Sequence, residues 1–239
     1  MRNMKGLKIQ MTGIFSFFRI PYNSLLMDTF IFPPKTTVLG MLGAAVGWDE
    51  DEFLKNLKKI LYGIIIKYPG ELFQETARIY KSKDAPIITK KIYPITKKMI
   101  YKPVYEVFIA SEDLDIVEKI YLGLQDPKYV ISLGDSENLF FPKDRKFVEI
   151  MDTMESSSDK FRCILPKEIY DTYYLNYSKI DDNIIPPKEA KMPIDFTGNG
   201  NKRRFIGINV VFYSGIEINM RNKINNNVWD FNGSKVYLF

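Results

Sequence analysis

Residues 30–47 read FIFPPKTTVLGMLGAAVG, and this stretch decides where the first strand region ends and the first helix begins. The proline pair 33–34 ends an extended segment, because proline fixes φ and restricts the residue before it. Residues 35–37 then offer a lysine and two threonines as helix-start residues, and residues 38–47 are predicted to form a helix.

Small residues recur within that helix at helical spacing. The face that they form contains Gly40, Gly43, Ala44 and Gly47. Glycine weakens helix propensity, so the face needs a compensating contact. We therefore expect it to pack closely against a sheet.

Strand and helix patterns alternate outward from this stretch. Strands are predicted at 7–18, 62–68, 103–110, 147–151 and 205–213. Helices are predicted from Asp49 to Leu61, with acids in the first turn, and from Leu114 to Leu124, capped by Ser111. Residues 131–138 are predicted to be a loop, 154–160 a loop or a boundary, and 181–200 a proline- and glycine-rich connection.

The predicted order is β-α(α)-β-β-α-β, which is typical of ferredoxin-like and RNA-recognition-motif domains. The fold class expected is therefore α+β. We expect a ferredoxin-like domain at 1–155 and a smaller β-rich region at 156–239.

Composition excludes several kinds of chemistry. The 239 residues contain no histidine and a single cysteine, Cys163. Ser-His-Asp triads, Cys-His dyads, histidine metal sites and cysteine zinc sites are thus ruled out. Gly134-Asp135-Ser136 resembles the start of a hydrolase motif that needs a histidine base, so we reject that interpretation. No motif for a metal or cofactor stands out, and we expect none.

The net charge of +5 is compatible with nucleic acid but does not establish it. The charge-free segment at 36–48 has 13 residues, too few for a bilayer crossing of about 20. The N-terminus lacks the pattern of a signal peptide. A cytoplasmic protein without membrane contact is expected.

Residues 81–102 are the most unusual segment, with seven lysines and one acid. Ile88-Thr89-Lys90-Lys91 recurs as Ile95-Thr96-Lys97-Lys98. β-Branched residues with lysine pairs indicate a protruding β-hairpin or arm, although a solvated loop is an alternative. Interleaved tyrosines at 80, 93 and 101 favour nucleic acid, because charge holds phosphates and rings stack on bases.

Three blocks resemble the CRISPR-associated Cas5 family of the RAMP superfamily. They are residues 30–47, the preceding Phe18-Arg19-x-Pro21 step, and Pro127-x-Tyr129 followed by Leu133-Gly134-x-Ser136-Glu137. The match spans roughly the first 140 residues, and the remaining hundred resemble the family only loosely.

The resemblance implies a subunit of type I Cascade that binds the five-prime handle of CRISPR RNA (crRNA). It also implies a ferredoxin-like domain with a long β-hairpin thumb at about 81–102. The partners implied are the crRNA, the Cascade backbone subunit and the large subunit.

We expect RNA contacts at the helix start and on the arm. Backbone N–H groups and the dipole at a helix start attract phosphate. The candidate residues are Arg19, Lys35, Thr36, Thr37, Lys81, Lys83, Lys90, Lys91, Tyr93, Lys97, Lys98 and Ser136. Solvent exposure alone is the alternative for Lys35, and turn capping is the alternative for Ser136 and Glu137.

Two other functions stay open. Family members of type I-C cleave precursor RNA with tyrosine, lysine and histidine, but this chain has no histidine. We therefore expect no enzyme activity and favour type I-B. A generic RNA-recognition-motif protein would need aromatic residues on its middle strands, where 62–68 offers isoleucines instead.

Overall fold

One nine-stranded sheet connects the two ends of the chain in the computed structural model, which describes residues 3–21, 26–81, 91–140, 148–198 and 204–239. Its strands, in spatial order, are β11 (Leu165–Pro166), β14 (Arg204–Ser214), β5 (Leu61–Tyr68), β8 (Val104–Ser111), β1 (Asn3–Thr12), β9 (Val148–Glu155), β16 (Val228–Phe231) and β17 (Ser234–Tyr237). The ninth strand, β13 (Ile185–Thr197), pairs with β14. The one parallel pairing among the described strands joins β14 to β5, at Ser214 and Ile66.

Both faces of the sheet are covered, as strand β8 illustrates. Tyr105, Val107 and Ile109 face one core, and Phe108 and Ala110 face the other. Successive side chains of a strand point to opposite faces, so a strand buried on both sides becomes a continuous apolar run.

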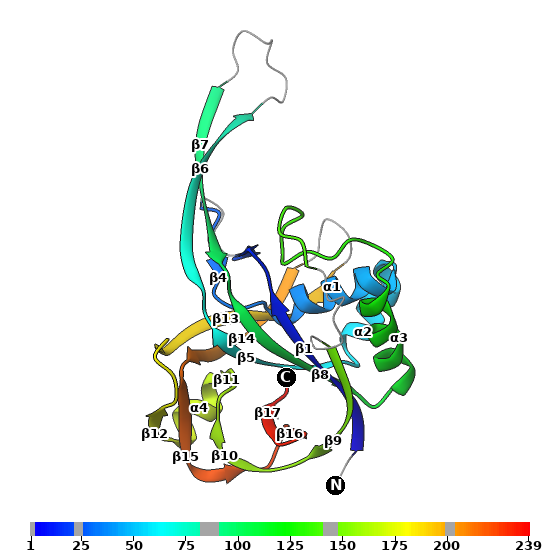
Figure 1. Ribbon diagram of the computed structural model, residues 1–239, viewed down its shortest axis with the longest axis vertical. Coiled ribbons are helices and arrows are strands. Elements are labelled where there is room, and N and C mark those ends of the chain that lie inside the picture. The colour runs from blue at the N-terminus through cyan, green and yellow to red at the C-terminus, as the bar shows by residue number, and fades with distance from the viewer. Residues whose placement is uncertain (1–2, 22–25, 82–90, 141–147, 199–203) are drawn as a thin grey trace.

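Helices cover the first of these two cores. They are α1 (Lys35–Val46), α2 (Glu50–Leu57) and α3 (Leu114–Gln125), which lie together on one side of the sheet (Figure 1). The acids at the start of α2 act as predicted, since Asp49 and Glu52 form a reciprocal capping box. The α+β class is confirmed.

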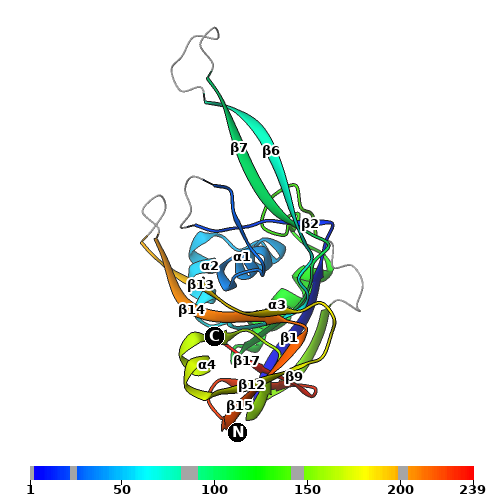
Figure 2. The ribbon, with the colours of Figure 1, turned by 90° about the vertical axis from the view of Figure 1, so that its left-hand side faces the viewer.

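The second core lies under the C-terminal strands. A three-stranded sheet of β10 (Ser158–Phe161), β15 (Ile216–Ile224) and β12 (Tyr174–Lys179) packs there with the short helix α4 (Lys167–Tyr173) (Figure 2). Residues beyond 155 therefore extend the main sheet at both ends, through β14 next to β5 and β16 next to β9. The division at 155/156 stays a prediction.

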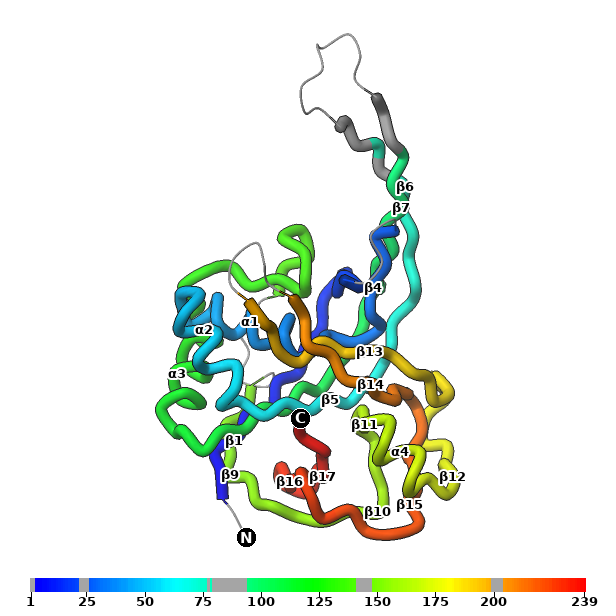
Figure 3. The backbone as a smooth tube through the Cα atoms, turned by 180° about the vertical axis from the view of Figure 1, so that it is seen from behind, coloured from blue at the N-terminus to red at the C-terminus, as the bar shows by residue number. Residues whose placement is uncertain are grey.

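A long β-hairpin projects from the body, and it is the most extended feature of the molecule (Figures 1 and 3). It consists of β6 (Glu71–Lys81) and β7 (Lys91–Tyr101), paired from Glu71↔Tyr101 to Lys81↔Lys91. The segment between them, 82–90, lies outside the described residues. Short strand β2 (Phe15–Ser16) pairs with β7 at its base, and β3 (Phe18–Arg19) pairs with β4 (Thr29–Phe30) nearby in the chain. The first strand of the hairpin begins at Glu71, ten residues before the start of the basic segment 81–102.

Several local predictions are wrong. A loop at 154–160 is one, because β9 runs to Glu155 and β10 begins at Ser158. The small-residue face of α1 does not contact the sheet: a Cβ on Gly40 would meet nothing within 4 Å, and Gly43 faces Trp48 and Phe53. Ser111 does not cap α3, because it belongs to β8 and its hydroxyl donates to the Lys59 carbonyl. The expected connection at 181–200 contains the long strand β13.

The prolines of β13 explain how that strand was missed. It is at the edge of the sheet and pairs only with β14 among the described strands. Pro186 and Pro187 lie at its start, and the register shifts between Pro193 and Asp195. Edge positions, strand starts and bulges tolerate proline, because no ladder N–H is lost there.

Candidate nucleic-acid interface

The base of the hairpin is fixed to the body at the middle of β7. Met27 forms a bridge with Lys97, and the Lys98 N–H donates to the Met27 carbonyl at 2.9 Å. Phe15 packs against both Phe73 and Tyr101, with ring centroids 5.3 Å apart in each pair. The lower half of the hairpin therefore belongs to the packed body of the protein.

Lys97 is buried in this base instead of reaching into solvent. Its Nζ lies 2.5 Å from Asp135 Oδ2 and 3.7 Å from a carboxylate oxygen of Glu137. It also lies 5.0 Å from the centre of the Phe17 ring, on which a cation is attracted to the π face. Burial lowers the pKa of Lys97, but the hydrogen bond and charge of Asp135, with Glu137, outweigh it and raise the pKa above its ordinary value.

Lys98 also forms an ion pair within the body of the protein. Its Nζ lies 3.4 Å from Asp28 Oδ2, and both side chains are about one-third exposed or less. The expectation that Lys97 and Lys98 are free surface cations is thus corrected. Both lysines are ion-paired within the chain.

The glycine-containing loop at residues 131–140 carries the carboxylates that hold Lys97. The Phe17 N–H donates to the Leu133 carbonyl at 3.0 Å, and the Leu133 N–H donates to the Asn138 carbonyl at 2.7 Å. Gly134 has φ +92°, and a Cβ there would lie 2.0 Å from the Phe17 carbonyl oxygen. Only glycine fits so close a backbone crossing. Ser136 and Glu137 are exposed on this loop.

The start of α1 lies inside the protein. Lys35 is 8% exposed and Thr36 is 6% exposed, while Thr37 is half-buried. Lys35 Nζ donates to the backbone oxygen of Phe239 at 3.1 Å. Burial lowers its pKa to about 8, against an opposing effect of Asp195. The expected surface lysine is therefore wrong, and no exposed ammonium marks this helix start.

Arg19 lies in β3, where it pairs with Thr29, and its side chain is exposed. It fits the predicted role of a surface cation near the hairpin base. Its partner strand β4 leads directly toward α1.

The outer half of the hairpin carries the remaining predicted cations. Lys81 and Lys91 are opposite each other at the ends of β6 and β7, and Tyr93 is opposite Ile79. Lys83 and Lys90 lie outside the described residues. Arg78, exposed on β6 and opposite Pro94, was missed because it precedes the basic run in the sequence. Its isolated position among apolar residues gave no signal.

Charges divide the hairpin into two parts. Glu71 and Glu75 are on the inner part, where Glu75 is opposite Lys97. Between residues 76 and 96 the sequence holds five cations and one acid, Asp84. Among the described residues, the cations Arg78, Lys81 and Lys91 lie toward the outer end, while the inner Glu75 is opposite Lys97.

Other kinds of site receive no support from the described residues. No three His, Cys, Asp or Glu side chains gather there to hold a metal ion. Cys163 is buried, and burial raises the pKa of its thiol to about 12. In the described part of the chain, none of the helices has the length and apolar character that crossing a bilayer requires.

Comparison with known families and structures identifies the class. The family model described as CRISPR-associated protein (Cas_Cas5) matches residues 6–158, which include most of β1, the sheet strands β5, β8 and β9, and the whole hairpin. This chain belongs to the CRISPR-associated Cas5 family. No curated protein sequence matches it.

Solved structures show a similar fold at low identity. A chain of a "CRISPR RNA-guided surveillance complex" matches with a TM-score of 0.54 and 14% identity, covering 90% of both chains. A "CRISPR protein from Archaeoglobus fulgidus" matches with a TM-score of 0.51 and 16% identity, covering 98% of both. A third match, titled "Crystal structure of Cas protein", has a TM-score of 0.42 and 18% identity and spans 56% of this chain and 58% of that one.

Proposed function

We propose that this protein is a non-catalytic Cascade subunit that binds the five-prime handle of crRNA. The observation that carries the proposal is the projecting hairpin, whose outer part concentrates cations while its inner part is fixed to the body. A cationic arm held by a rigid base can follow a phosphate backbone without losing its own position.

Single-stranded RNA suits this arm better than duplex. Lysine and arginine neutralise phosphates, and aromatic rings can stack on splayed bases. Tyr93 is on β7, within the basic outer part. Tyr101, by contrast, packs against Phe15 at the base of the hairpin, so this ring is already used in packing within the protein.

The family also supports a ferredoxin-like arrangement for the N-terminal part. The strands β9, β1, β8 and β5 are neighbours in that order, with α1 after β1 and α3 after β8. This is the order of a split βαβ fold. We propose that residues 1–155 form this unit, with the hairpin as its thumb, and that residues 156–239 complete it.

The proposed partners are the crRNA, the Cascade backbone subunit and the large subunit. Support comes from the likeness in fold to a chain of a surveillance complex, together with family membership. We propose a cytoplasmic location, and type I-B is our proposal for the subtype.

Two measurements test the proposal. The protein is co-expressed with a CRISPR array and its predicted partners, and the RNA that co-purifies is sequenced. Short RNAs with one constant five-prime end support handle binding, whereas RNAs of random ends contradict it.

The pure protein is also incubated with repeat RNA, with and without divalent cations. We expect no cleavage, because a chain without histidine lacks the usual proton-transfer side chain of such nucleases. Cutting at a single repeat position, abolished by a Tyr→Phe change, would establish the endoribonuclease alternative instead.

A further inference from the structure

A second basic surface lies on the opposite side of the sheet from helices α1 and α3. It is a groove of about 560 Å³ whose floor is formed by strands β1, β5 and β8. One wall is β10 with β15, and the other is the turn between β16 and β17. The groove is therefore built from strands of both halves of the chain, far from the outer ends of β6 and β7 (Figure 1).

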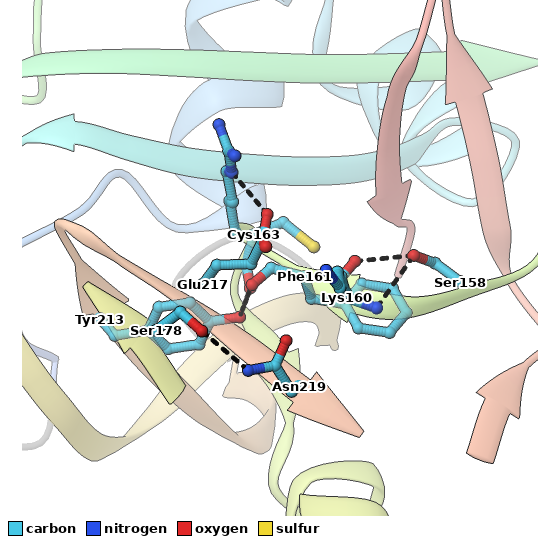
Figure 4. Close-up of polar contacts among 9 residues, drawn as sticks. Ser158, Lys160, Phe161, Cys163, Ser178, Tyr213, Glu217 and Asn219 are labelled. Atoms are coloured by element: carbon cyan, nitrogen blue, oxygen red, sulfur yellow. Dashed lines mark hydrogen bonds and ion pairs between the residues drawn. The ribbon is translucent and has the colours of Figure 1, made fainter. Parts of the chain in front are cut away.

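The charges in this groove are unequal. The groove is lined by five cations, Lys8, Lys67, Lys160, Arg162 and Lys235. It is also lined by three carboxylates, Glu106, Asp159 and Glu217. Two of the carboxylates are already neutralised: Glu106 pairs with Lys8 at 3.2 Å, and Glu217 with Arg162 at 2.9 Å. Figure 4 shows Ser158 hydrogen-bonded to the backbone of Lys160 in the β10 wall, at 2.7 and 3.1 Å.

Two lysines stay available for a ligand. Lys67 and Lys160 are exposed and form no ion pair within the described part of the chain. Lys67 has only a weak influence on Asp181, whose pKa is lowered mainly by backbone hydrogen bonds from Asn183 and Asp182. Lys235, in contrast, already donates to the Ser157 carbonyl at 3.0 Å.

The lining indicates what kind of anion fits. Among the described residues that line it, Ile65 is the only large apolar side chain and none is aromatic. A protein segment would need apolar pockets for anchor side chains, and stacked bases would need rings. A series of phosphates, by contrast, can be bound by cations alone, provided that a rigid surface holds them.

We propose that this groove binds the phosphates of a nucleic-acid strand, independently of sequence and separately from the hairpin. Lys67 and Lys160 make the contacts, and the Lys8–Glu106 and Arg162–Glu217 pairs hold the floor and wall in place. The site goes beyond handle binding, because it has no means of reading bases.

The test compares two variants that lose the same charge. Lys67→Ala/Lys160→Ala removes the free groove lysines, and Lys55→Ala/Lys119→Ala removes exposed lysines on α2 and α3, away from the groove. Both variants are made in a background with Arg78→Ala/Lys81→Ala/Lys91→Ala. RNA binding by the hairpin then does not hide RNA binding by the groove. The probe is a twelve-residue oligouridylate, titrated at several salt concentrations.

The groove variant should flatten the slope of log K against log salt by about 1–1.5 units relative to the control variant, at roughly −0.7 per phosphate. Equal slopes for the two variants overturn the proposal. So does a dodeca-glutamate peptide that competes as well as the oligouridylate, because it would indicate a surface for acidic protein. Handle binding by the intact hairpin is measured separately, so either proposal can fail alone.

Discussion

Lys97 on β7 and Asp135 on the glycine-containing loop form an ion pair of 2.5 Å that joins the hairpin to the body. The Lys97 side chain is 9% exposed, so the pair is shielded from the salt that weakens surface ion pairs. The pair thereby connects the hairpin to a loop 38 positions away in the sequence. A lysine that a basic run would assign to RNA is instead a structural residue.

Lys97→Ala should lower the free energy of unfolding by about 2 kcal/mol, because it leaves Asp135 without its buried partner. Lys98→Ala is the matched control, and its longer, more exposed pair with Asp28 should contribute less than about 1 kcal/mol. Urea denaturation of both variants measures the difference. Equal losses would mean that Lys97 does not anchor the hairpin.

Gly134→Ala should destabilise the protein much more than Gly233→Ala. Both glycines have φ near +90°, so both substitutions carry the same left-handed strain of about 1–2 kcal/mol. Only at Gly134 does the new Cβ meet backbone, at 2.0 Å from the Phe17 oxygen, whereas Gly233 has open space. We expect a further loss of at least about 2 kcal/mol at Gly134, measured by denaturant unfolding. Similar losses at both positions would show that the loop relaxes away from Phe17.

Gly40→Ala should have the opposite sign. The position is inside α1, its Cβ would meet nothing within 4 Å, and alanine favours helix by about 1 kcal/mol over glycine. A rise in the thermal midpoint is expected. A fall would mean that this outward face contacts another part of the protein or a second copy.

Lys35 should make stability depend on pH in the alkaline range. Its pKa falls from an ordinary 10.5 to about 8 in the folded protein, because burial disfavours the ammonium. Between these values the unfolded chain binds the extra proton, so the free energy of unfolding rises with pH, by at most about 1.4 kcal/mol per unit. Below pH 8 both states are protonated and the full penalty is present.

Lys35→Met isolates this effect, since it keeps an apolar stem of similar length without the charge. The pH dependence of urea unfolding between pH 8 and 10.5 should be less steep in the variant than in the parent protein. Parallel curves would show that Lys35 keeps its ordinary pKa when folded. RNA affinity should not change, because the side chain is 8% exposed.

The outer hairpin should dominate the salt dependence of handle binding. Arg78→Ala/Lys81→Ala/Lys91→Ala should flatten the slope of log K against log salt by about 2 units, at roughly −0.7 per phosphate. Lys55→Ala/Lys58→Ala/Lys119→Ala, with three exposed lysines on or near α2 and α3, is the control of equal charge. If the two variants give the same slope, RNA binds elsewhere.

Periodicity predicted the elements whose environment is simple. The α3 helix and the strands β5 and β8 have apolar residues at regular spacing and lie close to their predicted bounds, whereas α2 ends at Leu57, four residues before the predicted Leu61. The strand β13 was not predicted, because its prolines suit only an edge and its edge position is decided by distant residues. Residues 71–80 are predicted to be extended or part of a hairpin, but the sequence does not show that their partner strand is 91–101.

The site was harder to predict than the fold, because charge in a sequence does not tell where the charge is placed. Lys35 and Lys97 look like surface residues, yet their partners are Phe239 and Asp135, which are distant in the chain. Arg19 and Ser136 lie exposed as expected. Contact of any of these residues with RNA stays a prediction.

The dependence of β5 on the last strands has a consequence for how the chain reaches its native state. The N–H and carbonyl of Tyr62 pair with those of Phe239, and Ile66 pairs with Ser214. A nascent chain that has emerged only through β9 therefore has a bare edge at β5 and an uncovered apolar face on β8. Such edges pair readily with other chains. Folding intermediates of this protein should consequently be prone to aggregation until residues 204–239 are in place, and they are natural clients for a chaperone.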